Sequence, residues 1–135
     1  MHALARFVIA TALALPFAQP ALFPQNSVLA AGVALVGLAQ EWGEEFCRAA
    51  YRAEFGAGRN IGEAALIADI LNTLRQDAGA VLEQAQSDAI KAQLRTQTDE
   101  AVKLGIFGAP SFVTSDGELF WGNDRLEAAL AWIKR

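Results

Sequence analysis

The feature that most constrains the fold is the end of the chain, where helical patterning gives way to a β-hairpin. Phe112 and Val113 favour a strand, and Asp116-Gly117 is a strong signal for a two-residue hairpin loop. The run Leu119-Phe120-Trp121 can form the returning strand. Because a two-stranded hairpin is marginal by itself in water, it must pair with other strands. This ending predicts an α/β protein rather than a purely helical one.

A helix is expected directly after the second strand. Asn123 or Asp124 can cap its first turn. Leu126, Leu130 and Ile133 recur at helical spacing. We therefore expect these three side chains to form the buried stripe of the last helix.

The chain up to about residue 104 is predicted to be helical after an extended start. Three prolines prevent residues 15–25 from forming a continuous helix. Asn26 or Ser27 can cap the first helix that follows. Helical patterns then cover residues 28–38, 46–55, 66–74, 78–85 and 87–104, with glycines as stops.

The first part of the chain allows two interpretations. Arg6, the apolar run 7–17 and the small residue Ala18 resemble a secretory signal peptide. The same stretch also resembles an Ala- and Leu-rich helix that ends before Pro16. The run is short and interrupted by prolines, so we expect no membrane-spanning segment there.

Composition argues against several classes of site. Eleven basic and fifteen acidic residues give a net charge of −4 with no basic run, so a nucleic-acid groove is not expected. Cys47 is the single cysteine, which excludes an internal disulfide and a CxxC redox pair. With one histidine in addition, a zinc or other metal site is not expected. Glu44 and Glu45 disfavour a thiolate nearby, so Cys47 is interpreted as structural.

The first candidate site is the Ala109-Pro110 bond, which Gly108 precedes and a β-forming run follows. A cis X-Pro bond exposes the preceding backbone N–H and C=O for pairing with an extended peptide ligand. The alternative is an ordinary trans proline that opens a strand without losing a needed donor. The flanking residues make the cis form more frequent than it is among X-Pro bonds in general. The sequence does not decide between the cis and the trans form.

The second candidate site is Trp121-Gly122-Asn123-Asp124. Gly122 permits close backbone approach, and free N–H groups at the start of the last helix attract an anion such as a ligand carboxylate. Asp124 can accept a hydrogen bond from a ligand ammonium. The alternative is that Asp124 and Glu127 form an ordinary capping arrangement and Trp121 belongs to the core.

The third candidate site is the segment Phe23-Pro24-Gln25-Asn26-Ser27. An aromatic residue and a proline before a capped helix can line the wall of an apolar pocket. A hydrophobic staple with an N-cap explains the same residues, and the residue pattern alone favours it.

Four segments match a known protein family in its order and approximate spacing. The chain on these residues resembles the 2-hydroxychromene-2-carboxylate isomerases, relatives of kappa-class glutathione transferases and of the DsbA group. The last two segments together are specific, and the first two are weak individually. The segments are Leu15-Pro16-Phe17 through Phe23-Pro24-Gln25-Asn26-Ser27, Phe55 through Gly58-Arg59-Asn60-Ile61, Gly105 through Phe112, and Leu119 through Leu126.

The resemblance implies an α/β thioredoxin-like fold of the DsbA/kappa type that is mostly helical in this chain. Residues 1–104 would form an inserted helical domain, and residues 105–135 the C-terminal ββα half of the thioredoxin-like domain. The resemblance also makes Met1 to Leu15 the remnant of a helix rather than a signal, which implies a cytoplasmic protein.

The resemblance further implies glutathione as cofactor and a small aromatic molecule as substrate. The implied activity is a cis–trans isomerisation in which the glutathione thiolate adds to the substrate and later leaves. Ala109 would hold glutathione by backbone pairing, and the residues around Trp121 would bind its glutamyl end. The implied glutathione-binding residues are Ala109, Pro110, Trp121, Gly122, Asn123 and Asp124, and the implied substrate-binding residues are Phe23 and Asn26.

One departure from the family pattern concerns the start of the chain. The family begins with a strand–helix–strand unit whose Asp-Phe-x-Ser-Pro-type motif supplies a serine for the glutathione sulfur, and this sequence has neither. No catalytic residue is therefore assigned, and we expect a truncated product, a mispredicted start or one part of a split chain. A hairpin without its partner strands exposes an edge. We expect weak stability or a homodimer through that edge, and little isomerase activity.

Two other functions stay open. The first is a thiol oxidoreductase related to DsbA, against which the absence of a CxxC pair counts. The second is a non-catalytic helical binding module, exported if the N-terminus is a signal peptide.

Overall fold

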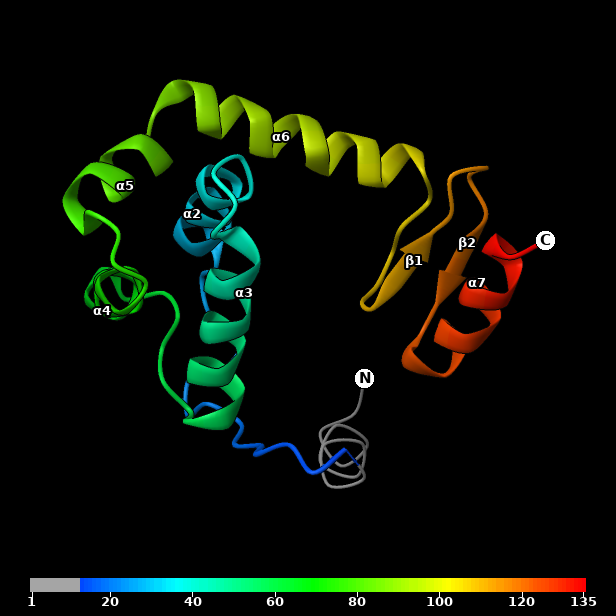
Figure 1. Cartoon of the computed structure of the whole chain (residues 1–135), viewed down its shortest axis with the longest axis horizontal. Coiled ribbons are helices and arrows are strands. Elements are labelled where there is room, and N and C mark those ends of the chain that lie inside the picture. The colour runs from blue at the N-terminus through cyan, green and yellow to red at the C-terminus, as the bar shows by residue number, and fades with distance from the viewer. Residues whose placement is uncertain (1–12) are drawn as a thin grey trace. The chain divides into compact units, whose positions relative to one another are not determined.

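The computed structural model describes residues 13–135, which form two compact units (Figure 1). Unit 1 ends at Leu94, and unit 2 is Arg95–Arg135. The two interpretations of the N-terminus, signal peptide or helix, concern mainly residues 1–12, which lie outside the described residues. Residues 13–27 form neither helix nor strand, so the extended stretch predicted from the prolines is confirmed.

The two units meet within one continuous helix, α6 (Asp88–Lys103). The observed division after Leu94 assigns the second half of α6 to unit 2, whereas the predicted boundary after residue 104 assigns all of α6 to the helical domain. The boundary at residue 104 stays a prediction.

Unit 1 is a bundle of helices whose bounds follow the sequence patterns closely. The predicted stretches 28–38 and 78–85 are helices with the same ends, and α6 is one residue shorter at each end than predicted. Asp77 caps α5, because its Oδ1 accepts a hydrogen bond from the Ala80 N–H at 3.0 Å. The helices are α2 (Val28–Leu38), α3 (Gly43–Tyr51), a π-helical turn η1 (Arg52–Gly56), α4 (Ala64–Thr73), α5 (Ala78–Ala85) and α6.

The core of unit 1 lies where α2, α3, α4 and α5 meet. Ile67 and Leu71 of α4 are fully buried, and Leu66 and Ile70 beside them are also buried. Val33 and Val36 of α2 and Phe46 of α3 complete the largest fully buried side chains. Each such side chain stabilises the folded state by about 1.5–3 kcal/mol relative to an exposed position.

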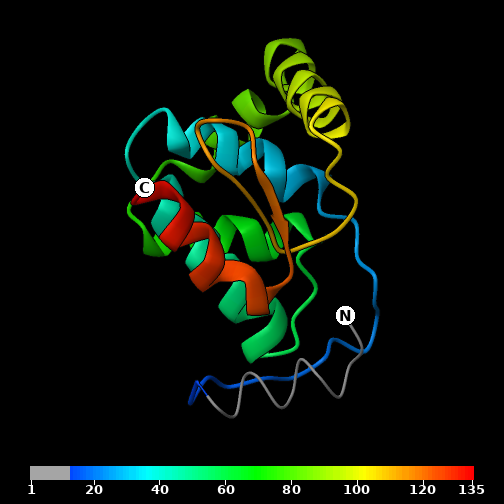
Figure 2. The same cartoon turned by 90° about the vertical axis from the view of Figure 1, so that its right-hand side faces the viewer.

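Unit 2 contains the predicted hairpin and the helix after it (Figures 1 and 2). β1 (Ser111–Val113) pairs antiparallel with β2 (Leu119–Trp121), and Phe112 stands opposite Phe120. α7 (Leu126–Ile133) packs against both strands. Within residues 13–135 the sheet consists of these two strands.

The hairpin loop is longer than the two residues predicted. The Thr114 N–H donates to the Glu118 carbonyl at 3.0 Å, which leaves Ser115, Asp116 and Gly117 as the loop. Gly117 has a φ of 86°, a left-handed conformation that glycine adopts without steric penalty. A turn followed by a left-handed residue is the usual form of a three-residue hairpin loop. The hairpin is confirmed, and its loop type is corrected.

The predicted buried stripe of the last helix is wrong. Leu126, Leu130 and Ile133 are exposed by 39%, 49% and 62%, whereas Ala129 is buried at 3%. Helical periodicity places Ala129 and Trp132 on one side. That side faces the hairpin, since Ala129 is buried and the Trp132 ring meets the Phe120 ring edge-on with centroids 6.0 Å apart. The leucines and the isoleucine therefore point away from the strands.

The predicted cap of the last helix is also wrong. A short 3-10 turn, η2 (Asn123–Arg125), precedes α7 and shifts its start to Leu126. No side chain caps either element. The predicted D-x-x-E capping arrangement between Asp124 and Glu127 is therefore not formed.

Candidate functional site

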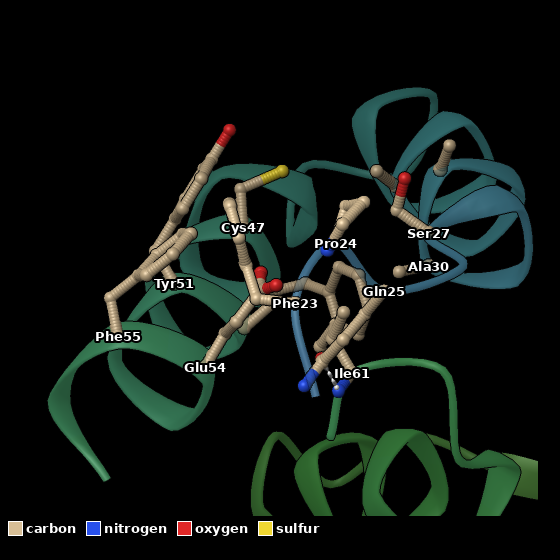
Figure 3. Close-up of a pocket in the computed structure, with 14 residues that line it drawn as sticks. Phe23, Pro24, Gln25, Ser27, Ala30, Cys47, Tyr51, Glu54, Phe55 and Ile61 are labelled. Carbon is tan, nitrogen blue, oxygen red and sulfur yellow. Dashed lines mark hydrogen bonds between the residues drawn. The ribbon is translucent and has the colours of Figure 1, made fainter. Parts of the chain in front are cut away.

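Unit 1 contains an apolar pocket of about 410 Å³ (Figure 3). Its walls come from the loop before α2, from α2 itself, and from one face of α3 and η1. Phe46, Ala50, Tyr51 and Phe55 all line it, as their spacing of four, one and four residues on one helix face allows. A cavity of this size matches the lower range of small-molecule sites.

The aromatic wall of the pocket is arranged around Phe55. Its ring stacks on Phe17 at 6.4 Å between centroids and on Tyr51 at 6.3 Å, and it meets the edge of Phe23 at 6.2 Å. The Phe55 carbonyl also accepts a hydrogen bond from the Ala18 N–H. Phe55 belongs to the single π-helical turn of the chain's described part, a feature that is frequent at functional sites.

A second long-range contact fixes the loop that carries Phe23. The Gln25 Oε1 accepts a hydrogen bond from the Ile61 N–H at 2.7 Å, between residues 36 apart in sequence. The Phe23-Pro24 bond is cis. Gln25 and Ile61 both line the pocket, so the hydrogen bond between them joins two of its walls.

Both interpretations of the Phe23–Ser27 segment describe part of the structure. Phe23, Pro24, Gln25 and Ser27 line the pocket, as the functional interpretation predicts. Asn26 instead accepts a hydrogen bond from the Val28 N–H through Oδ1 at 3.0 Å, just before α2, whose N-cap residue Ser27 forms no side-chain capping bond. Asn26 does not line this pocket; it borders a separate hollow of about 280 Å³ between α2, α5 and α6.

Sequence reasoning missed two polar residues of the pocket, Cys47 and Glu54. Burial, and secondarily the charge of Glu44, raises the pKa of the Cys47 thiol. This agrees with a structural role for Cys47. Burial also raises the pKa of Glu54. The signal for Glu54 was its position four residues after Ala50 and eight after Phe46, on the same helix face.

The second candidate site is the end of the hairpin in unit 2, where β1 begins and β2 ends. The antiparallel register places Ser111 opposite Trp121 and so brings the two predicted segments together. The Ala109-Pro110 bond is cis, which decides between the two forms left open. The Gly122 N–H donates to the Pro110 carbonyl at 2.9 Å. Ala109 is exposed, and its N–H and C=O make no hydrogen bond within residues 13–135.

Trp121 lies over Gly108 rather than in the core. A Cβ added at Gly108 would collide with the indole ring, so only glycine fits beneath it. The ring centroids of Trp121 and Phe107 are 5.0 Å apart, and Trp121 remains 50% exposed. The alternative that Trp121 is a core residue is therefore wrong, and Phe120, at 6% exposure, takes that place.

Gly122, Asn123 and Asp124 follow Trp121 and complete this corner. Gly122 has a φ of 106°, a conformation that disfavours any side chain. Asn123 and Asp124 are exposed, and their side chains and backbone N–H groups make no hydrogen bond in the described part of the chain. The corner thus offers free donors and acceptors around Ala109 and Asp124.

None of the helices described between residues 13 and 135 is both long and apolar enough to cross a membrane.

Comparisons with known proteins agree with this architecture. The model of the DSBA-like thioredoxin domain matches residues 4–134. A curated relative, 2-hydroxychromene-2-carboxylate isomerase of Sphingobium xenophagum, is 33% identical over 94 residues, which are 70% of this chain and 48% of the relative. The chain therefore spans about half the length of that relative.

A solved structure of a 2-hydroxychromene-2-carboxylate isomerase shares the fold. It superposes with a TM-score of 0.78 and 25% identity, over 98% of this chain and 68% of the other. The resemblance inferred from the sequence segments is confirmed, as is the thioredoxin-like fold class. The chain belongs to the DSBA-like thioredoxin domain family.

Proposed function

We propose that this chain provides the ligand-binding parts of a glutathione-dependent isomerase of the 2-hydroxychromene-2-carboxylate isomerase type. The proposal depends most on the similarity to isomerases of that name, which for the solved structure extends over 98% of this chain. The single cysteine argues against an oxidoreductase that works through its own CxxC pair.

The hairpin corner suits glutathione by the chemistry of its free groups. An extended peptide can pair with the unpaired N–H and C=O of Ala109 as a further strand would. The exposed Asp124 carboxylate can accept hydrogen bonds from an ammonium group, and the free N–H groups of Asn123 and Asp124 can bind a carboxylate. These are the two charged groups at the glutamyl end of glutathione. Bound there, glutathione would supply the thiol nucleophile.

The pocket of unit 1 suits the aromatic part of a small substrate. The rings of Phe23, Tyr51 and Phe55 offer apolar faces, and aromatic pairs gain about 0.5–1.5 kcal/mol beyond area burial. The role of these residues is to bind and orient a ring and to exclude water from it. No residue of the described chain is assigned a proton-transfer or nucleophilic step.

Titration with glutathione, followed by amide NMR, tests the cofactor part of the proposal. We expect millimolar glutathione to shift the signals of Ala109, Ser111, Asn123 and Asp124. Asp124→Asn should weaken binding about 5- to 10-fold through loss of the charge-assisted hydrogen bond. Asp99→Asn on the exposed face of α6 is the matched control and should bind like the wild type.

An activity assay tests the isomerase part. The chain is mixed with 2-hydroxychromene-2-carboxylate, and its conversion is followed by absorbance with and without glutathione. Conversion that requires both glutathione and the protein supports the proposal. Shifts confined to residues outside the hairpin corner, or conversion that is independent of glutathione, would contradict it.

A further inference from the structure

Among residues 13–135, Glu54 is the one charged residue that lines the pocket of unit 1. Figure 3 shows its carboxyl group directed inward, toward the space between Cys47 and Phe23. No lysine, arginine or histidine of the described part of the chain belongs to the lining. The pocket therefore combines aromatic walls with a single negative group.

Glu54 has no partner of its own among the described residues. It takes part in neither ion pair of residues 13–135, Arg48–Glu44 and Arg59–Asp69, and its carboxyl group accepts no hydrogen bond there. The half-buried Glu54 carboxylate has no donor among the described residues, so a ligand hydroxyl that reaches it replaces water with a charge-assisted hydrogen bond. A ligand that brings a second negative charge meets repulsion in surroundings of low polarity.

We propose that Glu54 determines which end of an aromatic ligand enters the pocket, accepting a ring-borne hydroxyl and excluding a ring-borne carboxylate. Specificity of this kind combines an attractive contact with one ligand group and a repulsive contact with another, both made by the Glu54 carboxylate. The identification of the ligand as a substrate depends on the proposed function, whereas the charge selectivity of the pocket does not. In the substrate named for the isomerase relatives, the 2-hydroxy and 2-carboxylate groups share one ring carbon, so Glu54 would keep that end of the molecule out of the pocket.

The test compares two ligands with the same ring system, 2-naphthol and 2-naphthoate, at neutral pH and without glutathione. Isothermal titration calorimetry measures their dissociation constants, and amide shifts of Ala30 and Ala50 locate binding in the pocket. We expect 2-naphthol to bind the wild type at least about 10-fold more tightly than 2-naphthoate. Glu54→Gln should reduce this ratio to about 1–3, mainly by improving the binding of 2-naphthoate.

Glu45→Gln is the matched control. It removes the same charge from α3 at an exposed position that does not line the pocket, so the ratio should stay at the wild-type value. Circular dichroism establishes that each variant is folded. Because the wild-type comparison needs no variant, 2-naphthoate binding as tightly as 2-naphthol overturns the proposal even if Glu54→Gln fails to fold. Retention of the preference in a folded Glu54→Gln protein, or failure of both ligands to bind, also overturns it. None of these outcomes depends on glutathione binding.

Discussion

The indole of Trp132 donates a hydrogen bond from Nε1 to Oδ2 of Asp116 at 2.8 Å, and this bond joins α7 to the hairpin loop. The other carboxylate oxygen, Oδ1, accepts a hydrogen bond from the Thr114 hydroxyl. These two bonds, that of Thr114 first, lower the pKa of Asp116. Asp116 thus connects the loop, the strand end and the last helix of unit 2.

Asp116→Asn is expected to change how unit 2 responds to acid. A carboxyl group whose pKa is lowered by folding stabilises the folded state above its usual pKa of about 3.9. That contribution is lost as the pH falls through the lowered value. The indole N–H signal of Trp132, followed by NMR during an acid titration, should therefore change with pH in the wild type and much less in the variant.

Asp124→Asn serves as the control for this titration, because Asp124 is exposed and forms no hydrogen bond in residues 13–135. It should keep the wild-type acid response. An unchanged response in Asp116→Asn would show that the loop contact does not contribute to acid stability.

Gly108→Ala is expected to displace the Trp121 indole. The added methyl group would overlap the ring, and such overpacking costs about 1–3 kcal/mol. The measurement is thermal unfolding together with the indole N–H shift of Trp121. Gly79→Ala is the opposite case, because Gly79 is exposed within α5. The free energy of unfolding of this variant should rise by roughly 0.5–1 kcal/mol. A Trp121 signal unchanged in Gly108→Ala would contradict the contact.

Two leucine truncations test the assignment of core and surface. Leu71→Ala removes a fully buried side chain and should lower the free energy of unfolding by about 2–5 kcal/mol. Leu130→Ala affects a side chain that is 49% exposed on α7 and should remain within about 0.5 kcal/mol of the wild type. Urea unfolding measures both. A large loss in Leu130→Ala would show that this face of α7 is covered in solution.

Glu54→Gln is expected to leave the fold as stable as the wild type or more stable at neutral pH. Burial raises the pKa of Glu54, so this residue favours the folded state most below its usual pKa of about 4.3. That contribution is lost as the pH rises through the raised value. The gain in thermal midpoint from Glu54→Gln should therefore shrink below about pH 4. The exposed control Glu45→Gln should show no such trend, and a clear loss of stability in Glu54→Gln at neutral pH would contradict the argument.

Much of the local structure follows from short-range patterns. The bounds of α2, α5 and α6 are predicted to within a residue, because each helix has its own periodicity and end signals. The two strands are predicted for the same reason, since the β-forming runs around Asp116-Gly117 need no distant information. The burial of Leu126, Leu130 and Ile133 is predicted wrongly, because periodicity identifies an apolar face but not what lies against it.

Of the two candidate sites, one follows from local sequence patterns and the other does not. The hairpin corner is predictable because the antiparallel register of adjacent strands brings Ser111 opposite Trp121. The sequence by itself therefore determined the helices, the hairpin and the placement of this corner. Only the tertiary structure decided the pocket, since it depends on Gln25 meeting Ile61 and on Phe17 and Phe23 meeting Phe55. Such contacts between distant residues arise from the packing of whole elements, which is why Glu54 becomes a pocket residue only once the chain is folded.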